Sequence, residues 1–177
     1  MNWDAIGAIG EIVGAAAVVI TILYLAGQTR QASRNYAAQA PQWMSDGARN
    51  WFSSMRQDPE FTALIRLSIH HWDRLNGNEQ TRVHAFYCEQ IVHLDAMLEM
   101  SNQGVIDTAR TTAWIDNSVG LLITPGGGRW WESARHLFSP GVREVLDGRL
   151  AHPETWAPPW TVLPYFQLDE GEDRRPT

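Results

Sequence analysis

The chain has 177 residues, enough for one domain with a hydrophobic core and too few for two ordinary domains. Its formal net charge is −6 and its 14 cationic residues are scattered arginines, so we expect no nucleic-acid partner. Cys88 is the only cysteine, which excludes a disulfide within the chain.

The first predicted element is a long apolar helix. From Ala5 to Ala26 the only charged residue is Glu11. At about 1.5 Å per residue this run extends roughly 32 Å, close to the ~30 Å hydrocarbon core of a bilayer. Trp3 and Tyr24 lie near its ends, where interfacial aromatic residues occur. The run predicts one transmembrane helix, with a buried core helix and a cleaved signal peptide as the alternatives.

The charges beside this helix predict its orientation. The N-terminal side carries Asp4 and no arginine, whereas Arg30 and Arg34 follow the apolar run. By the positive-inside rule, the N-terminus lies outside a bacterial inner membrane and the remaining chain lies in the cytoplasm.

Small residues recur along one face of the helix at alternating spacings of three and four, which form a heptad seam. The seam comprises Gly7, Gly10, Gly14, Ala17, Thr21, Tyr24, Gln28 and Gln31, and Glu11 lies beside it. An ionisable group in an apolar segment is a functional candidate. We expect Gly7 to Thr21 of this seam, together with Glu11, to pack against a second copy or another membrane subunit. Alternatively, the small residues reflect only the ordinary composition of membrane helices.

The remaining sequence predicts an all-α fold: a compact bundle of four to six helices, then an extended tail rich in proline and tryptophan. The predicted segments are 1–34 for the membrane helix and its extension, 35–150 for the bundle and 151–177 for the tail. Pro41 predicts a kink or restart. Helix starts are predicted at Asp58-Pro59, Asn76, Asp107 and Ser139-Pro140, and a break at Pro125-Gly-Gly-Gly128.

The tryptophans in the second half of the chain are candidate partner contacts. One ring of the Trp130-Trp131 pair is expected in the core and the other at a membrane surface or partner. Trp156 and Trp160 lie in the tail, which we expect to wrap over the bundle or to reach a partner. The last ten residues are expected to be disordered.

Two stretches resemble a known family. The run from Gly7 to Ala26, followed by Gln28 and Arg30-Gln31, resembles the opening of a large family of uncharacterised bacterial membrane proteins that is frequent in marine proteobacteria. The run from Gly128 to Pro140 resembles that family's closing motif. The resemblance implies a membrane anchor followed by a bundle, and it carries over no activity and no site residues. Gly27-Gln-Thr29 departs from it, because relatives are more hydrophobic there.

Candidate chemical groups are few. His84, Cys88 and Asp95 share one side of a predicted helix, and Glu89 and His93 form an i, i+4 pair on another. Metal sites in bundles use Glu-x-x-His motifs from several helices, which this sequence lacks, so no metal or cofactor is expected. The run Gly126-Gly-Gly-Arg129 before a helix is compatible with phosphate binding, but a plain turn is the preferred interpretation.

With no catalytic constellation, the sequence favours a non-enzymatic inner-membrane protein. We expect it to self-associate as a scaffold or to be an accessory subunit of a larger membrane complex. The alternatives are a membrane-tethered sensor that binds a small apolar or aromatic ligand between its helices, and a homo-oligomeric pore with Glu11 near one mouth.

Overall fold

The computed structural model describes residues 3–168, except for the side chains of residues 3–9, 12, 13, 36 and 37. This part of the chain is all-α, with seven α-helices, four short 3-10 turns and no strand. The chain divides into two compact units, Met1–Pro41 and Gln42–Thr177, called unit 1 and unit 2 below.

Helix α1 (Trp3–Gln57) has 55 residues and is helical through Pro41, so the predicted restart at that residue is wrong. Proline removes one backbone hydrogen bond, but the alanines and glutamines on either side of Pro41 are good helix formers and continue the helix. Among the residues that the structure describes, no helix combines the length and the apolar character needed to cross a membrane. The transmembrane span therefore stays a prediction.

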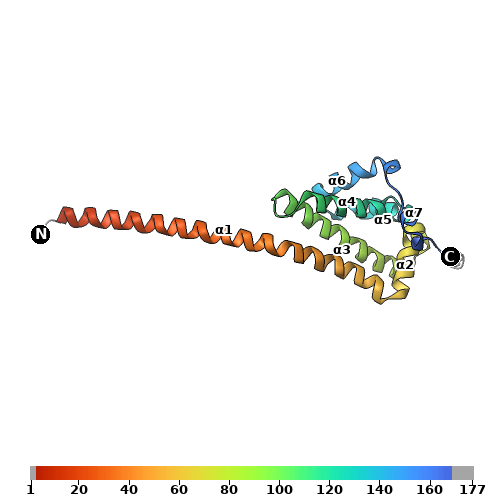
Figure 1. Ribbon diagram of the computed structural model, residues 1–177. Helices are drawn as coiled ribbons and strands as arrows, with labels where there is room; N and C mark the ends of the chain where they lie inside the picture. The colour runs from red at the N-terminus through yellow and green to blue at the C-terminus, as the bar shows by residue number, and fades with distance from the viewer. Residues whose placement is uncertain (1–2, 169–177) are drawn as a thin grey trace. The chain divides into compact units, whose positions relative to one another are not determined.

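Within residues 42–168, unit 2 contains the end of α1 and six further α-helices, which Figure 1 labels. These are α2 (Pro59–His70), α3 (Gly77–Asn102), α4 (Thr108–Leu122), α5 (Pro125–Ala134), α6 (Pro140–Leu150) and the single turn α7 (Pro159–Val162). The long helix α3 packs against α2, α4 and α6, and α5 packs against α2 and α4. The bundle that the sequence predicts is thus present, and α3 is its centre.

The predicted helix starts are confirmed by their capping bonds. Asp58 accepts the Phe61 N–H at 2.9 Å, and Asn76 forms a reciprocal capping box with Glu79. Asp107 and Ser139 cap α4 and α6 in the same way. Each cap satisfies backbone N–H groups that a helix start leaves without an internal partner, which is why these local sequence signals are reliable.

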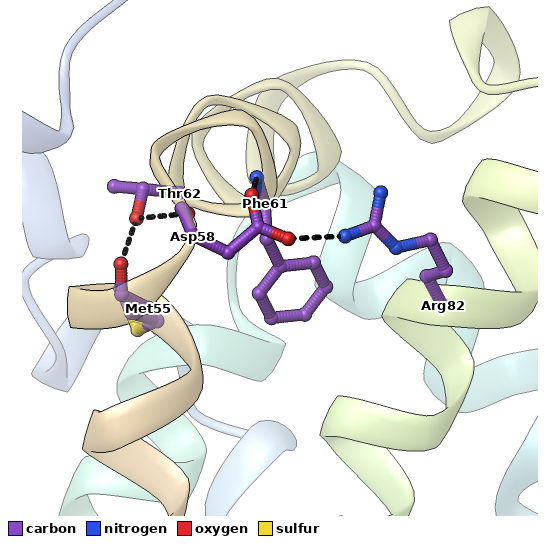
Figure 2. A network of polar contacts seen from close by, with 5 residues as sticks. All are labelled: Met55, Asp58, Phe61, Thr62 and Arg82. Carbon is purple, nitrogen blue, oxygen red and sulfur yellow. Dashed lines mark hydrogen bonds and ion pairs between the residues drawn. The ribbon is translucent and has the colours of Figure 1, made fainter.

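The cap of α2 also joins three segments of unit 2 (Figure 2). The Asp58 carboxylate pairs with Arg82 of α3 at 2.7 Å, and the guanidinium lies over the Phe61 ring, 5.2 Å from its centroid. The Thr62 hydroxyl contacts the carbonyl oxygens of Met55 and Asp58. These bonds fix the corner at which α1 ends and α2 begins.

The run from Pro125 to Gly128 is the first turn of α5, so the break predicted there is wrong. The break lies just before it, where the Thr124 hydroxyl caps the helix by accepting the Gly127 N–H at 3.0 Å. A Cβ atom on Gly126 would lie 1.7 Å from the Ser68 carbonyl oxygen. Glycine is required here because α5 approaches the backbone of α2 closely, and the proline at the first helical position is compatible with a helix start.

The core lies between α3 and its neighbours. Its largest fully buried side chains include Tyr87, Ile91 and Leu94 of α3 and Trp130 of α5. The chain after α6 packs onto this core through four half-buried side chains, Trp156, Trp160, Phe166 and Leu168. The tail therefore covers part of the bundle. The predicted disorder of the last ten residues falls on 169–177, outside the described residues, apart from Leu168.

Candidate functional site

A cavity of about 230 Å³ lies in unit 2, between the end of α1, α3 and α4. Three tryptophans line it together with small, polar and titratable residues. The lining residues are Trp43, Gly47, Trp51, Glu89, Gln90, Val92, His93, Ala96 and Trp114. We call this cavity the aromatic pocket.

His93 projects from α3 between two of the tryptophan rings. Its imidazole stacks on Trp43 with 4.4 Å between ring centroids, and it meets Trp114 edge-on at 4.9 Å. Gly47 permits this position, because a Cβ atom there would lie 2.3 Å from His93 Cε1. Burial lowers the pKa of His93, although the nearby Glu89 carboxylate opposes this shift. We conclude that the imidazole in the pocket is neutral at pH 7.

Trp51 and Gln90 form the deeper wall of the pocket, with side chains that are 5% and 1% exposed. The Trp51 ring stacks on Phe86, with 4.8 Å between centroids. Gln90 Nε2 donates to the Ser118 hydroxyl at 3.1 Å, and that hydroxyl donates to the Trp114 carbonyl oxygen at 2.9 Å. These contacts hold the wall in one arrangement, so it is preorganised.

Four polar atoms of the lining residues have no hydrogen-bond partner and are shielded from solvent. They are Trp51 Nε1, Gln90 Oε1, His93 Nε2 and Trp114 Nε1. Leaving a buried donor or acceptor unpaired costs about 1–3 kcal/mol. Buried polar atoms elsewhere in unit 2, such as Tyr87 Oη and Thr111 Oγ1, also lack a partner, so these four atoms do not by themselves mark a ligand site. The three tryptophan rings are the feature that the pocket shares with small-molecule sites.

The structure brings His84 and Cys88 together, with 3.3 Å between Cys88 Sγ and His84 Nε2. The other imidazole nitrogen, Nδ1, accepts the indole N–H of Trp130 at 3.1 Å. Because an indole N–H only donates, Nδ1 carries no proton and Nε2 carries it. An imidazolium would set two donors against each other, and burial raises the pKa of the Cys88 thiol. The arrangement therefore favours a neutral thiol over the thiolate of a catalytic dyad.

The acidic residues of α3 have structural partners. Asp95 accepts the Ser139 hydroxyl at 2.7 Å, and Glu89 accepts the Asn50 side-chain amide at 2.7 Å. Within residues 3–168, no three His, Cys, Asp or Glu side chains gather so that they could hold a metal ion. Glu89 is exposed, but His93 is turned inward between rings, and the sequence interpretation of a surface pair missed this difference.

The glycine-rich start of α5 packs closely against neighbouring backbone. Gly126 and Gly127 are buried, and a Cβ atom on Gly127 would lie 2.1 Å from the Leu121 carbonyl oxygen. Arg129 forms an ion pair with Asp73. The helix start therefore has no space beside its two buried glycines for a phosphate, the ligand that the sequence allowed as an alternative to a plain turn.

The structure buries both Trp130 and Trp131, which are 0% and 4% exposed, so the expectation that one ring faces outward is wrong. Each indole N–H has a partner inside the fold, His84 for Trp130 and Asp147 for Trp131. Burial of both rings is favourable because neither loses its hydrogen bond. Trp156 and Trp160 of the tail are half-buried and keep some accessible surface.

The seam residues of α1 lie in unit 1. The side chains of Glu11, Ala17 and Thr21 are exposed, and a Cβ atom added to Gly10 or Gly14 would meet nothing within 4 Å outside the helix. The Thr21 hydroxyl donates to the Ala17 carbonyl oxygen at 2.8 Å. The surroundings of Gly7 are outside the described set. The described part of the seam is thus open along its length.

The aromatic pocket was not predicted from the sequence. A usable signal was present, because Trp43, Gly47 and Trp51 recur at spacings of four and so share one helix face, as do Glu89 and His93. Trp114 comes from a distant segment and had no local signal. No protein-family model, curated protein or solved structure matches this chain.

Proposed function

We propose that this chain is a non-enzymatic protein anchored in a bacterial inner membrane by unit 1, where it self-associates or serves as an accessory subunit of a larger complex. One observation carries the proposal. Six large apolar side chains of α1 are each more than half exposed, namely Val18, Val19, Ile20, Ile22, Leu23 and Leu25.

These six side chains cover about 220° of the helix circumference, because successive residues are about 100° apart. The remaining sector holds the small residues of the seam, Gly14 and Ala17, together with Thr21 and Tyr24. A helix that exposes so wide an apolar surface and carries no charged side chain there is normally covered by protein or by lipid, since burial of apolar surface is worth roughly 25 cal/mol per Å². Thr21 suits such surroundings because its hydroxyl already bonds to Ala17. In the sequence the apolar run extends from Ala5 to Ala26 and includes residues whose side chains are outside the described set.

The open seam supports a helix partner for unit 1. Gly10, Gly14 and Ala17 place little bulk on one face, and in a membrane such faces allow two backbones to approach closely. Arg30 and Arg34 follow the apolar run and favour a cytoplasmic position for the bundle.

Alkaline carbonate extraction of membranes from cells that express the full chain tests the anchor. We expect the unaltered chain to stay in the membrane pellet and Leu23→Arg to shift substantially to the supernatant, because a cation in the apolar run is costly. Gln31→Arg is the matched control: Gln31 is also exposed on α1 but lies beyond the run, and we expect it to stay in the pellet. An unaltered chain that is fully extracted would refute the anchor.

A second function, a membrane-tethered sensor of a small ligand, is supported by the aromatic pocket. Its volume of about 230 Å³ and its three tryptophan rings are what a sensor bundle needs and what a fully packed scaffold lacks. The two functions are compatible, because the anchor belongs to unit 1 and the pocket to unit 2.

A further inference from the structure

We propose that unit 2 binds an anionic amphiphile with a single alkyl chain, such as a fatty acid, in a groove beside its tail. The groove is lined by side chains of α1 and of the tail and by one glycine of α4, among them Phe52, Met55, Gly120, Leu163, Tyr165 and Phe166. We call it the tail groove. This inference goes beyond the functions proposed above, because it depends neither on the anchor nor on the aromatic pocket.

The tail groove presents apolar side chains that solvent can reach. Phe52, Leu163 and Tyr165 are 55%, 38% and 66% exposed, and all three line the groove. Single exposed apolar side chains are ordinary, but a contiguous group of them marks a binding surface. The lining residues, which all belong to the described chain, include no charged side chain. The groove itself therefore favours the apolar part of a ligand.

His70 of α2 holds the tail side of the groove in place. Its Nε2 lies 3.0 Å from the Phe166 carbonyl oxygen and donates to it, because a carbonyl oxygen only accepts. The imidazole also stacks on Trp160 of the tail, with 4.3 Å between ring centroids. The tail side of the groove is thus preorganised, which lowers the entropic cost of binding.

A second hollow adjoins the tail groove and carries positive charge. The two share Phe52 and Met55, and the second hollow is also lined by Arg49 and Arg56. Arg49 pairs with Asp46 at 3.4 Å, whereas among the described residues no ion pair involves Arg56. An exposed guanidinium presents a planar set of N–H donors that matches a carboxylate. The second hollow therefore favours an anionic group.

The two hollows together define the class of ligand. An alkyl chain in the tail groove and a carboxylate at Arg56 would complement both of them, with Phe52 between the two parts of the molecule. An uncharged chain would gain nothing from the arginines, and a cationic amphiphile would be repelled by them. The complementary charge therefore selects an anion among amphiphiles of equal chain length.

The test uses the full chain in phosphatidylcholine nanodiscs and a dodecanoate analogue with a photoreactive diazirine near the end of its chain. Labelled positions are mapped by peptide mass spectrometry. We expect saturable labelling within 51–55, 117–121 and 159–166. Dodecanoate should compete at least ~10-fold better than dodecanol or dodecyltrimethylammonium, a difference of about 1.4 kcal/mol. Labelling confined to unit 1, or equal competition by the three amphiphiles, would overturn the proposal.

One pair of variants tests the position of the alkyl chain. A Cβ atom on Gly120 meets nothing within 4 Å, so Gly120→Leu places its side chain in open space at the groove and should reduce labelling there at least ~10-fold. Gly148→Leu adds the same side chain on α6, where a Cβ atom also meets nothing within 4 Å, and should leave labelling unchanged. Equal labelling of the two variants would overturn this position.

A second pair tests the anionic group. Arg56→Gln removes the cation but keeps a polar side chain of similar reach, and it should reduce the preference for dodecanoate over dodecanol severalfold. Arg110→Gln is its control, because Arg110 is an exposed arginine of α4 that lines neither hollow. The same preference in both variants would show that Arg56 does not bind the carboxylate.

A second copy of the chain is the alternative occupant of the tail groove. A benzophenone side chain placed at Phe52 distinguishes the two, because it cross-links whatever lies against the groove. Adducts between two chains, with no labelling by the fatty acid, would assign the groove to self-association and overturn the proposal. Adducts with added dodecanoate, lost in Gly120→Leu, would support it.

Discussion

In unit 1, Val19 and Ile20 are 55% and 66% exposed, whereas in unit 2 Ile69 and Val83 are completely buried. The polar groups show the opposite pattern. Thr21 of unit 1 bonds within its own helix, but Trp51 and Gln90 of unit 2 each keep a buried polar atom without a partner. The described part of unit 1 thus exposes apolar side chains, whereas unit 2 buries its apolar side chains together with some polar atoms that lack a partner.

The largest expected effect is on stability, and it contrasts a buried side chain of unit 2 with an exposed side chain of unit 1. Trp130→Ala in the core of unit 2 should lower the free energy of unfolding by about 3–5 kcal/mol, because it removes a fully buried ring. Leu23→Ala in unit 1 should change it by less than about 0.5 kcal/mol, because Leu23 is 67% exposed. Urea unfolding of the full chain in detergent, followed by tryptophan fluorescence, measures both. A comparable loss of unfolding free energy in the two variants would contradict this difference in packing between the units.

A smaller effect tests close packing within unit 2. Gly126→Ala should destabilise the bundle by about 1–3 kcal/mol or more, because the new methyl group meets the Ser68 carbonyl. Gly148→Ala adds the same group in open space on α6 and should stabilise by up to about 1 kcal/mol. Melting temperatures of the two variants should therefore move in opposite directions. A shift of the same sign would show that α5 does not need glycine at this position.

The smallest expected effect concerns acid. The Phe61 N–H bond, with Arg82 as a further cause, lowers the pKa of Asp58 below its ordinary value of 3.8. A carboxyl group with a lowered pKa in the folded state stabilises the fold above the unfolded pKa, and this contribution is lost as pH falls through the folded pKa. The melting temperature should thus decrease slightly more between pH 5 and pH 2.5, taken as roughly one unit either side of that value, for the unaltered chain than for Asp58→Asn. Equal decreases in melting temperature for the two proteins would show that the Asp58 carboxylate does not stabilise the fold in this way.

The local features of unit 2 were predictable from sequence, and the long-range ones were not. Asp58 and Asn76 start helices through bonds to residues within three positions, so the sequence indicates them directly. The sequence predicts a break at Gly126, because the contact with Ser68 that requires glycine there joins residues distant in sequence. The pocket was missed for the same reason, since Trp114 and Trp43 reach His93 only through packing of three helices.

Native mass spectrometry of the full chain, extracted gently from the cells that produce it, tests the proposal that unit 1 binds a partner. We predict a defined oligomer or a complex with foreign subunits. Gly14→Ile should disrupt it by filling the open seam, whereas Ala16→Ile, which lies off the seam, should not. A chain that is monomeric and partnerless in every sample, or an assembly that tolerates both substitutions equally, would contradict this account.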